Sequence, residues 1–121
     1  MAILPFEASV RQAADSAIVE LRGEIDGFAE QALNDAYAQA TTNQAHTVLL
    51  NFNGVNYINS TGIALIVGLL AQARKSGRRL LTYGLSDHYV EIFKITRLAD
   101  FMSIFADEAA ALEAAKSGNT S

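Results

Sequence analysis

Two neighbouring hydroxyl side chains are the strongest candidates for chemistry in this sequence. Ser60 and Thr61 follow Asn59 and precede Gly62, directly before a run of apolar and small residues. Asn and Ser are favoured helix N-caps, because a side-chain oxygen accepts a hydrogen bond from an otherwise unpaired amide. A hydroxyl at such a helix start is also accessible and surrounded by amide donors, so it tolerates a phosphate well. The segment therefore fits a plain helix cap and a phosphoacceptor equally.

The other candidates for catalysis or metal binding are isolated. Glu24 and Asp26 flank a predicted helix start, where capping and the helix dipole explain acidic residues more simply than paired catalytic carboxylates do. His46 and His88 lack metal-ligand spacing, and Ser60 is not in the GxSxG motif of hydrolases. The chain has no cysteine, which excludes disulfides and thiolate chemistry. We expect no enzyme, no metal site and no cofactor.

Length and composition predict one domain over residues 1–121, with a frayed tail at 115–121. The chain has 121 residues, half of them hydrophobic, which suffices for one ordinary core. Its net charge of −4 provides no basic surface for nucleic acid or an anionic membrane. The apolar run at 62–71 is far below the roughly 20 residues that span a bilayer, and no secretion signal is recognisable. We expect a cytoplasmic protein that binds other proteins, without nucleic acid and without direct membrane insertion.

The hydrophobic periodicity alternates between strand and helix spacing. Strands are predicted around 4–10, at 16–23 up to Gly23, at 47–52 before an Asn53-Gly54 turn, at 78–84 and at 101–105. Helices are predicted at 27–42, at 60–76 up to Gly77, at 86–95 and at 107–116. This order implies an α/β fold, with a mixed four- to five-stranded sheet and about four helices packed on it. Ser60 then lies at the carboxyl edge of the sheet, where ligands and partners bind in open α/β folds.

The helix that begins at Ser60 has two distinct faces. At 100° per residue, its large apolar residues fall on one face, which we expect to cover the sheet: Ile66, Leu69, Leu70 and Ala73. Small residues fall on the opposite face, on the same side as Ser60 and Thr61: Ala64, Gly68 and Ala71, followed by Lys75. This stripe is either a plain exposed surface or a surface that lets a partner approach closely.

The motifs, in this order, resemble those of the STAS-domain anti-sigma factor antagonists. GEID at 23–26 is similar to the family's Gly-Glu-Ile/Leu-Asp after the second strand, and NSTGI at 59–63 to its Asp-Ser-Ser/Thr-Gly-Ile/Leu. The resemblance covers roughly residues 16–112 and includes the later segment IFKITRL. It implies a single STAS-like domain.

The resemblance implies a protein that switches partners. In this family the unphosphorylated antagonist binds an anti-sigma factor serine kinase of the histidine-kinase-like ATPase fold. That kinase either releases its sigma factor or phosphorylates the antagonist, and a PP2C-type phosphatase removes the phosphate. Matched residue by residue, the phosphorylated serine falls on Ser60, with Thr61 as second choice, and the turn glycine on Gly62. The resemblance and the helix faces together predict a partner-binding set: Glu24, Asp26, Asn59, Ser60, Thr61, Gly62, Ala64, Gly68 and Ala71.

Two positions depart from the family pattern. The aspartate that precedes the serine is Asn59 here, and the glycine of a later Thr-Gly-Leu is Arg97. An alternative function is a STAS accessory or scaffolding subunit, for example of a lipid-transport ABC system, which binds partners without a phosphorylation switch. A kinase and phosphatase in the gene neighbourhood favour the first function, and a lipid ABC operon favours the second.

Overall fold

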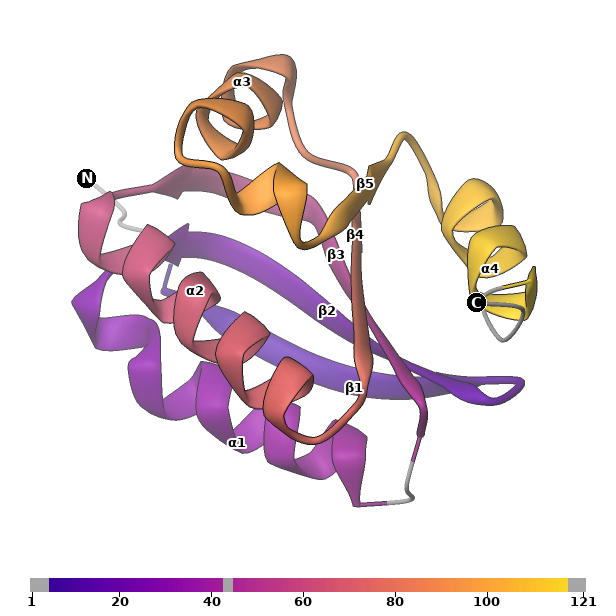
Figure 1. Cartoon of the computed structure of the whole chain (residues 1–121). Helices are drawn as coiled ribbons and strands as arrows, with labels where there is room; N and C mark the ends of the chain where they lie inside the picture. Colours follow the sequence, from indigo (N-terminus) through magenta and orange to yellow (C-terminus); the bar gives the residue numbers. More distant parts are fainter. Residues whose placement is uncertain (1–4, 43–44, 118–121) are drawn as a thin grey trace.

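The computed structural model describes residues 5–42 and 45–117, which form a five-stranded mixed sheet and four α-helices (Figure 1). The elements are β1 (Glu7–Ala13), β2 (Ser16–Ile25), the 3-10 turn η1 (Gly27–Ala29), α1 (Glu30–Thr41), β3 (Thr47–Ile58), α2 (Ser60–Lys75), β4 (Arg79–Tyr83), α3 (Asp87–Ile95), the 3-10 turn η2 (Leu98–Asp100), β5 (Ser103–Phe105) and α4 (Glu108–Ser117). The predicted fold class is confirmed.

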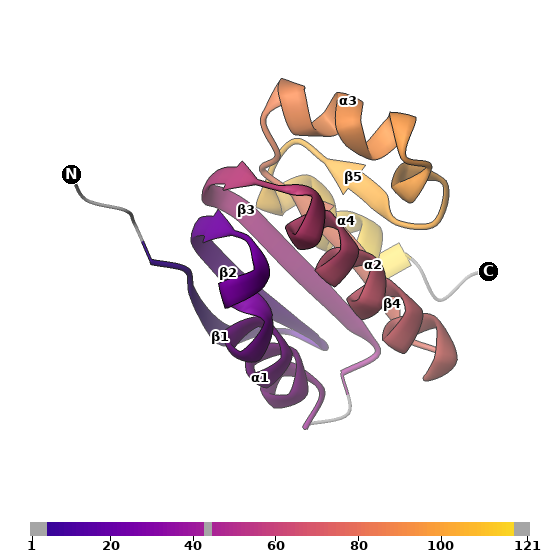
Figure 2. The same ribbon diagram turned by 90° about the vertical axis from the view of Figure 1, so that its left-hand side faces the viewer.

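The strands lie in the sheet in chain order, from β1 to β5. β1 and β2 form an antiparallel hairpin, whereas β2, β3, β4 and β5 pair in parallel. Parallel neighbours need a crossover, and α1, α2 and α3 provide the three that this order requires. The carboxyl ends of β2 and β3 therefore meet at one edge of the sheet, and α2 begins at that edge (Figure 2).

Apolar side chains cover both faces of the sheet. One face packs against α1, α2 and α3, and the other packs against α4 around Ile18, Leu49, Leu81 and Ala111. Successive residues of β2 consequently point to different helices, so that Ile18 faces α4 and Val19 faces the larger core. Each fully buried aliphatic side chain contributes roughly 1.5–3 kcal/mol relative to an exposed one. The central strands are apolar on both sides because both sides are covered.

The predicted faces of α2 are confirmed. Its large residues are buried against the sheet: Ile66, Leu69, Leu70 and Ala73. Its small residues and the lysine are exposed: Ala64, Gly68, Ala71 and Lys75. After the helix, Gly77 adopts a φ of +72°, and the Arg78 amide donates to the Ala73 carbonyl at 2.8 Å. The helix thus ends where the sequence predicted, in a left-handed turn that favours glycine.

Two glycines that suggested the ends of strands lie inside strands, so these predictions are wrong. Gly54 pairs with Arg22 within β3, and a Cβ atom there would lie 2.8 Å from the Arg22 Cβ atom. Gly23 has a φ of +95° within β2, and a Cβ atom there would lie 2.4 Å from the Pro5 carbonyl oxygen. Each glycine permits a close backbone approach beside a register shift between β2 and β3. The two strands therefore extend to Ile25 and Ile58, which carries them to the start of α2.

The chain ends differ from their predicted limits. β1 lies at Glu7–Ala13, later than the predicted strand around 4–10, whose first residue is outside the described residues. Residues 115–117 belong to α4 rather than to a frayed tail, and 118–121 are outside the described residues. The guanidinium of Arg79 donates to the carbonyls of Ala114 and Ala115 at 3.2 and 3.5 Å, within the last turn of α4.

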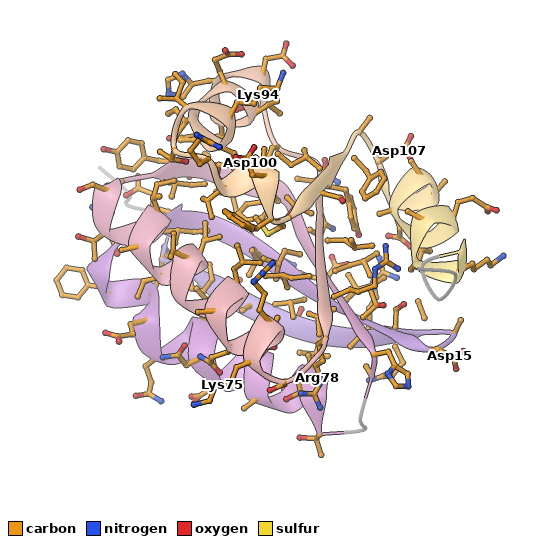
Figure 3. The ribbon with its side chains drawn as sticks, in the orientation of Figure 1. Asp15, Lys75, Arg78, Lys94, Asp100 and Asp107 are labelled. Atoms are coloured by element: carbon orange, nitrogen blue, oxygen red, sulfur yellow. The ribbon has the colours of Figure 1, made fainter. Side chains whose placement is uncertain are left out.

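Charged side chains project from the outer sides of the elements. Lys75 at the end of α2, Lys94 on α3 and Asp107 before α4 are exposed and lie at the periphery of the molecule (Figure 3). Among the helices of residues 5–42 and 45–117, none has the length and apolar character needed to cross a bilayer.

Candidate functional site

Asn59 caps α2. Its backbone is extended, and its Oδ1 atom accepts a hydrogen bond from the Gly62 amide at 2.8 Å. Its own amide donates to the Ile25 carbonyl at 3.1 Å, which ties the cap to the end of β2. Ser60 is the first helical residue, is exposed, and does not perform the capping. The capping explanation therefore applies to Asn59 and leaves the Ser60 hydroxyl accessible.

Gly62 brings the helix start against the sheet. It is buried, and a Cβ atom at this position would lie 2.1 Å from the Ile25 carbonyl oxygen and 2.9 Å from the Ile58 side chain. A real Cβ atom does not tolerate such a contact with backbone, so α2 can approach β2 this closely only with glycine here. The position of Ser60 relative to β2 depends on this contact.

The GEID segment lies beside the start of α2. Asp26 accepts a hydrogen bond from the Phe28 amide at 2.9 Å and caps η1. Gly27 lies next to Thr61, since a Cβ atom on Gly27 would be 3.6 Å from the Thr61 methyl carbon. Glu24 is partly buried one position before Ile25, whose carbonyl holds Asn59. Capping thus explains Asp26, and the loop contributes acidic groups to the surroundings of Ser60.

The end of β3 is held in place from α3. The Tyr89 hydroxyl accepts a hydrogen bond from the Ile58 amide at 2.9 Å, immediately before Asn59. Tyr89 itself is buried against the larger core. Arg97, which stands where the family pattern has a glycine, follows α3 and adopts a left-handed φ of +70°. The cap of α2 consequently rests on β2, β3 and α3.

Three exposed apolar side chains near this edge were not predicted as site residues. Phe28 is 97% exposed, Tyr57 49% and Val67 46%, whereas Ile95 and Phe101 are exposed on the segment around α3. Each is adjacent in sequence to a buried residue: Ala29, Ile58 and Ile66. Strand alternation could have identified Tyr57, because neighbouring strand residues point to opposite faces, and the helical wheel could have identified Val67, which lies about 100° from Ile66. Phe28 is therefore an exposed aromatic side chain that directly follows Gly27, the neighbour of Thr61.

A charged network on the opposite face anchors α4. Arg11 forms ion pairs with Glu20, at 2.7 Å from Nε to Oε2, and with Glu108. The Tyr83 hydroxyl donates to Glu108 at 2.9 Å. The hydrogen bonds from Arg11 and Tyr83 lower the pKa of Glu108, whereas burial and the bond to Glu108 raise the pKa of Tyr83. These groups tie α4 to β1, β2 and β4 and take no part in the edge that carries Ser60.

The two histidines lie apart from the start of α2. His46 precedes β3 at the opposite edge of the sheet, and His88 is exposed in the first turn of α3, with its ring edge-on to Tyr89 at 4.8 Å. In the described ranges, no group of three or more His, Cys, Asp or Glu side chains has the arrangement of a metal site.

Comparison with known proteins identifies the family. The sequence profile of the STAS domain matches residues 7–111, and the chain therefore belongs to the STAS domain family. An anti-sigma-B factor antagonist of Staphylococcus epidermidis is 30% identical over 86 residues, which are 71% of this chain and 80% of that protein.

Solved structures share the fold. An anti-sigma-factor antagonist (STAS) domain protein from Planctomyces limnophilus superposes with a TM-score of 0.78 at 20% identity, over 92% of this chain and 99% of that one. The Bacillus cell fate determinant SpoIIAA in its phosphorylated form gives a TM-score of 0.66 at 21% identity, over 90% and 97% of the two chains.

Proposed function

We propose that this protein is an anti-sigma factor antagonist that switches partners through reversible phosphorylation of Ser60. Its partner is an anti-sigma factor serine kinase of the histidine-kinase-like ATPase fold, and a PP2C-type phosphatase restores the unmodified form. The names of relatives support a regulator that acts by binding rather than an enzyme. A protein of the same fold, SpoIIAA, has been solved in unphosphorylated and phosphorylated forms.

The position of Ser60 is the observation that carries this proposal. Asn59 provides the N-cap, so the neighbouring hydroxyl is exposed and available for transfer. A phosphate of about −1.5 to −2 charge at the first turn of α2 interacts favourably with the helix dipole. The kinase supplies the base, the metal ion and the nucleotide, so the transfer requires only an accessible hydroxyl from this chain.

The surface around Ser60 suits a protein partner. The exposed small residues Ala64, Gly68 and Ala71 allow a partner backbone to approach α2 closely. Phe28 adds an exposed aromatic side chain near Thr61, and Glu24 and Asp26 add negative charge. Such a surface fits a partner with an apolar pocket and a basic rim. A phosphate on Ser60 introduces bulk and further negative charge here and would weaken that docking.

Phosphate mapping tests the acceptor. The protein is incubated with its cognate kinase and ATP, and the modified residue is located by mass spectrometry. We expect phosphate on Ser60 in the parent and in Thr61→Val, and none in Ser60→Ala. Undiminished phosphorylation of Ser60→Ala would refute the assignment. Phosphate found on Thr61 would show that Thr61, and not Ser60, is the acceptor.

Binding measurements test the docking surface separately. Ala71→Glu places a carboxylate on an exposed position of α2 and should weaken kinase binding by tenfold or more, about 1.4 kcal/mol. Ala109→Glu is the matched control, because it makes the same change at an exposed position of α4 on the opposite face. Calorimetric titration measures binding, and thermal melts establish that each variant is folded. Equal binding by both folded variants would place the docking surface elsewhere. Tight kinase binding of the parent without phosphate transfer would favour the accessory or scaffolding function.

A further inference from the structure

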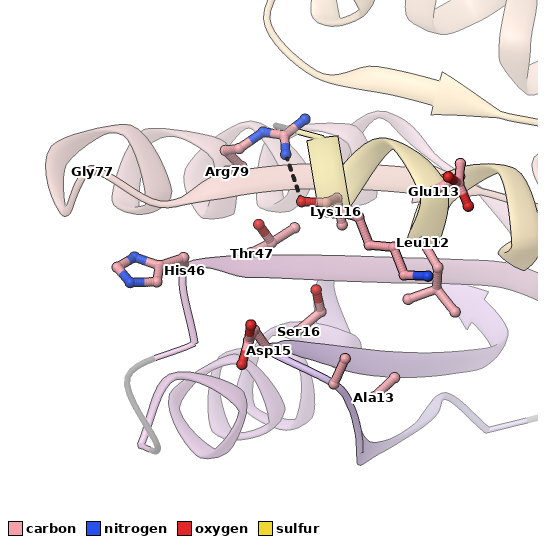
Figure 4. Close-up of a pocket in the computed structure, with 12 residues that line it drawn as sticks. Ala13, Asp15, Ser16, His46, Thr47, Gly77, Arg79, Leu112, Glu113 and Lys116 are labelled. Carbon is pink, nitrogen blue, oxygen red and sulfur yellow. Dashed lines mark hydrogen bonds between the residues drawn. The ribbon is translucent and has the colours of Figure 1, made fainter. Parts of the chain in front are cut away.

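A cavity of about 640 Å³ opens at the sheet edge opposite Ser60, beneath the last turn of α4 (Figure 4). Ser16, Thr47 and Arg79 are the first residues of β2, β3 and β4, and the parallel register places them side by side. Their side chains lie on the same face as Ile18, Leu49 and Leu81, the face that α4 covers. Two hydroxyls and a guanidinium therefore form the floor of the cavity.

The two hydroxyls on this floor lack protein partners. Ser16 and Thr47 are each only 5% exposed, and their hydroxyl groups make no hydrogen bond within residues 5–42 and 45–117. In Figure 4 both hydroxyls point into the space under α4. Because both hydroxyls face the cavity rather than the closed core, a ligand that accepts two hydrogen bonds could replace water there.

Arg79 supplies a positive charge to the cavity. Its side chain is half-buried, and its Nη1 atom donates to carbonyls of Ala114 and Ala115 in α4. The ion pairs of the described part of the chain all involve other arginines. With Nη1 directed at α4, the Nε and Nη2 atoms remain for an anion. A carboxylate fits such a fork with two parallel hydrogen bonds.

The walls of the cavity indicate what kind of group a bound anion would carry. Ala13, Leu112 and Ala115 line it with apolar surface, whereas the exposed side chains of His46 and Lys116 stand at its rim. Asp15 and Glu113 are also exposed lining residues, and their carboxylates repel anions, most strongly those with more than one charge. The volume lies within the usual range of small-molecule sites, about 300–1,000 Å³.

We propose that this cavity binds a small aliphatic monocarboxylate, with the carboxylate on Ser16, Thr47 and Arg79 and the hydrocarbon chain against Leu112 and the alanines. The site is distinct from the partner surface, because it lies at the amino ends of the parallel strands and Ser60 follows the carboxyl end of β3. Its occupancy would fix α4 to the sheet, since the ligand bridges the floor and the helix.

Titration of the full chain with sodium hexanoate tests the site. We expect saturable shifts of the Ser16, Thr47 and Arg79 amide signals in ¹⁵N NMR spectra, with a dissociation constant of about 1 mM or tighter. Hexanamide is the neutral control of the same shape and should bind at least roughly tenfold more weakly, because it cannot pair with the guanidinium. Inorganic phosphate is the second control.

Three variants separate ligand binding from stability. Thr47→Val removes one hydroxyl with little change of shape and should weaken hexanoate binding roughly tenfold, while the melting temperature stays equal or rises. Arg79→Gln should abolish binding, and Arg22→Gln, which removes an exposed cation elsewhere on the sheet, should not change it. Any of four results would overturn the proposal: no saturable shifts, equal binding of hexanamide, tighter binding of phosphate, or unchanged binding by Thr47→Val and Arg79→Gln.

Discussion

Two glycines of α2 should respond in opposite ways to the same substitution. In Gly62→Ala, the new methyl group would lie 2.1 Å from the Ile25 carbonyl oxygen, about 1.3 Å closer than the 3.4 Å at which ordinary contact begins. In Gly68→Ala, the methyl group would meet nothing within 4 Å. The comparison therefore isolates the contact between the helix start and β2.

The magnitudes follow from packing and helix propensity. Alanine is favoured over glycine inside a helix by about 1 kcal/mol, which is the full expected gain for Gly68→Ala. Overpacking costs about 1–3 kcal/mol, and the upper part of that range applies at Gly62 because a backbone carbonyl cannot rotate away. The free energy of unfolding of Gly62→Ala should therefore fall by about 1–2 kcal/mol, because the higher helix propensity of alanine offsets part of the overpacking cost. The two variants should differ by about 2–3 kcal/mol.

Urea denaturation followed by circular dichroism measures both free energies of unfolding, provided that the dependence on urea is the same in each variant. Phosphorylation kinetics add a second measurement, because displacement of the helix start moves Ser60 in Gly62→Ala and leaves it in place in Gly68→Ala. Wild-type stability of Gly62→Ala would show that α2 does not approach Ile25 as described. Destabilisation by Gly68→Ala would show that the small stripe is packed rather than exposed.

Three further predictions concern single residues. Asn59→Asp retains the cap, so we expect nearly unchanged stability and faster phosphorylation in a kinase assay; slower transfer would show that the kinase is adapted to the neutral residue. Arg97→Gly removes a non-glycine residue with left-handed backbone and also removes an exposed ion pair. Chemical denaturation should show a free energy of unfolding that is about 1 kcal/mol higher. A lower value would mean that the ion pair outweighs the backbone strain. The pKa of Glu108 is lowered in the folded state, so its stabilisation is present at neutral pH and is lost as the pH falls through that pKa. Glu108→Gln should therefore narrow the difference in free energy of unfolding between about pH 7 and about pH 3, and an unchanged difference would contradict the role of Arg11.

The features that the sequence predicted well depend on local patterns. The buried face of α2 follows from spacing at 100° per residue, and its end follows from Gly77, whose left-handed turn is a property of a few neighbouring residues. The cap at Asn59 is local as well. These features did not require knowledge of which strands are neighbours.

The features that were missed depend on contacts between strands. Asn53-Gly54 has the local signature of a turn, yet Gly54 is required because β2 passes 2.8 Å from where its Cβ atom would be. The cavity floor depends on the register of β2, β3 and β4, which sets Ser16, Thr47 and Arg79 in one row. No single segment of the sequence contains that information.

Several hydrogen bonds and one close backbone contact hold the start of α2, and they bear on how a phosphate on Ser60 would act. Asn59 is bonded to Ile25 and Gly62, Gly62 lies against the β2 backbone, and Ile58 is held by Tyr89. A phosphate on an exposed hydroxyl of this turn meets favourable backbone amides and has no buried contact to break. Under the proposed function, phosphorylation would therefore leave the helix in place and change the charge and shape of the surface that carries Phe28 and the small residues of α2. Under the proposed function, discrimination between the two states would be left to the partner, whose surface would have to fit the unmodified face closely enough for one phosphate to prevent docking.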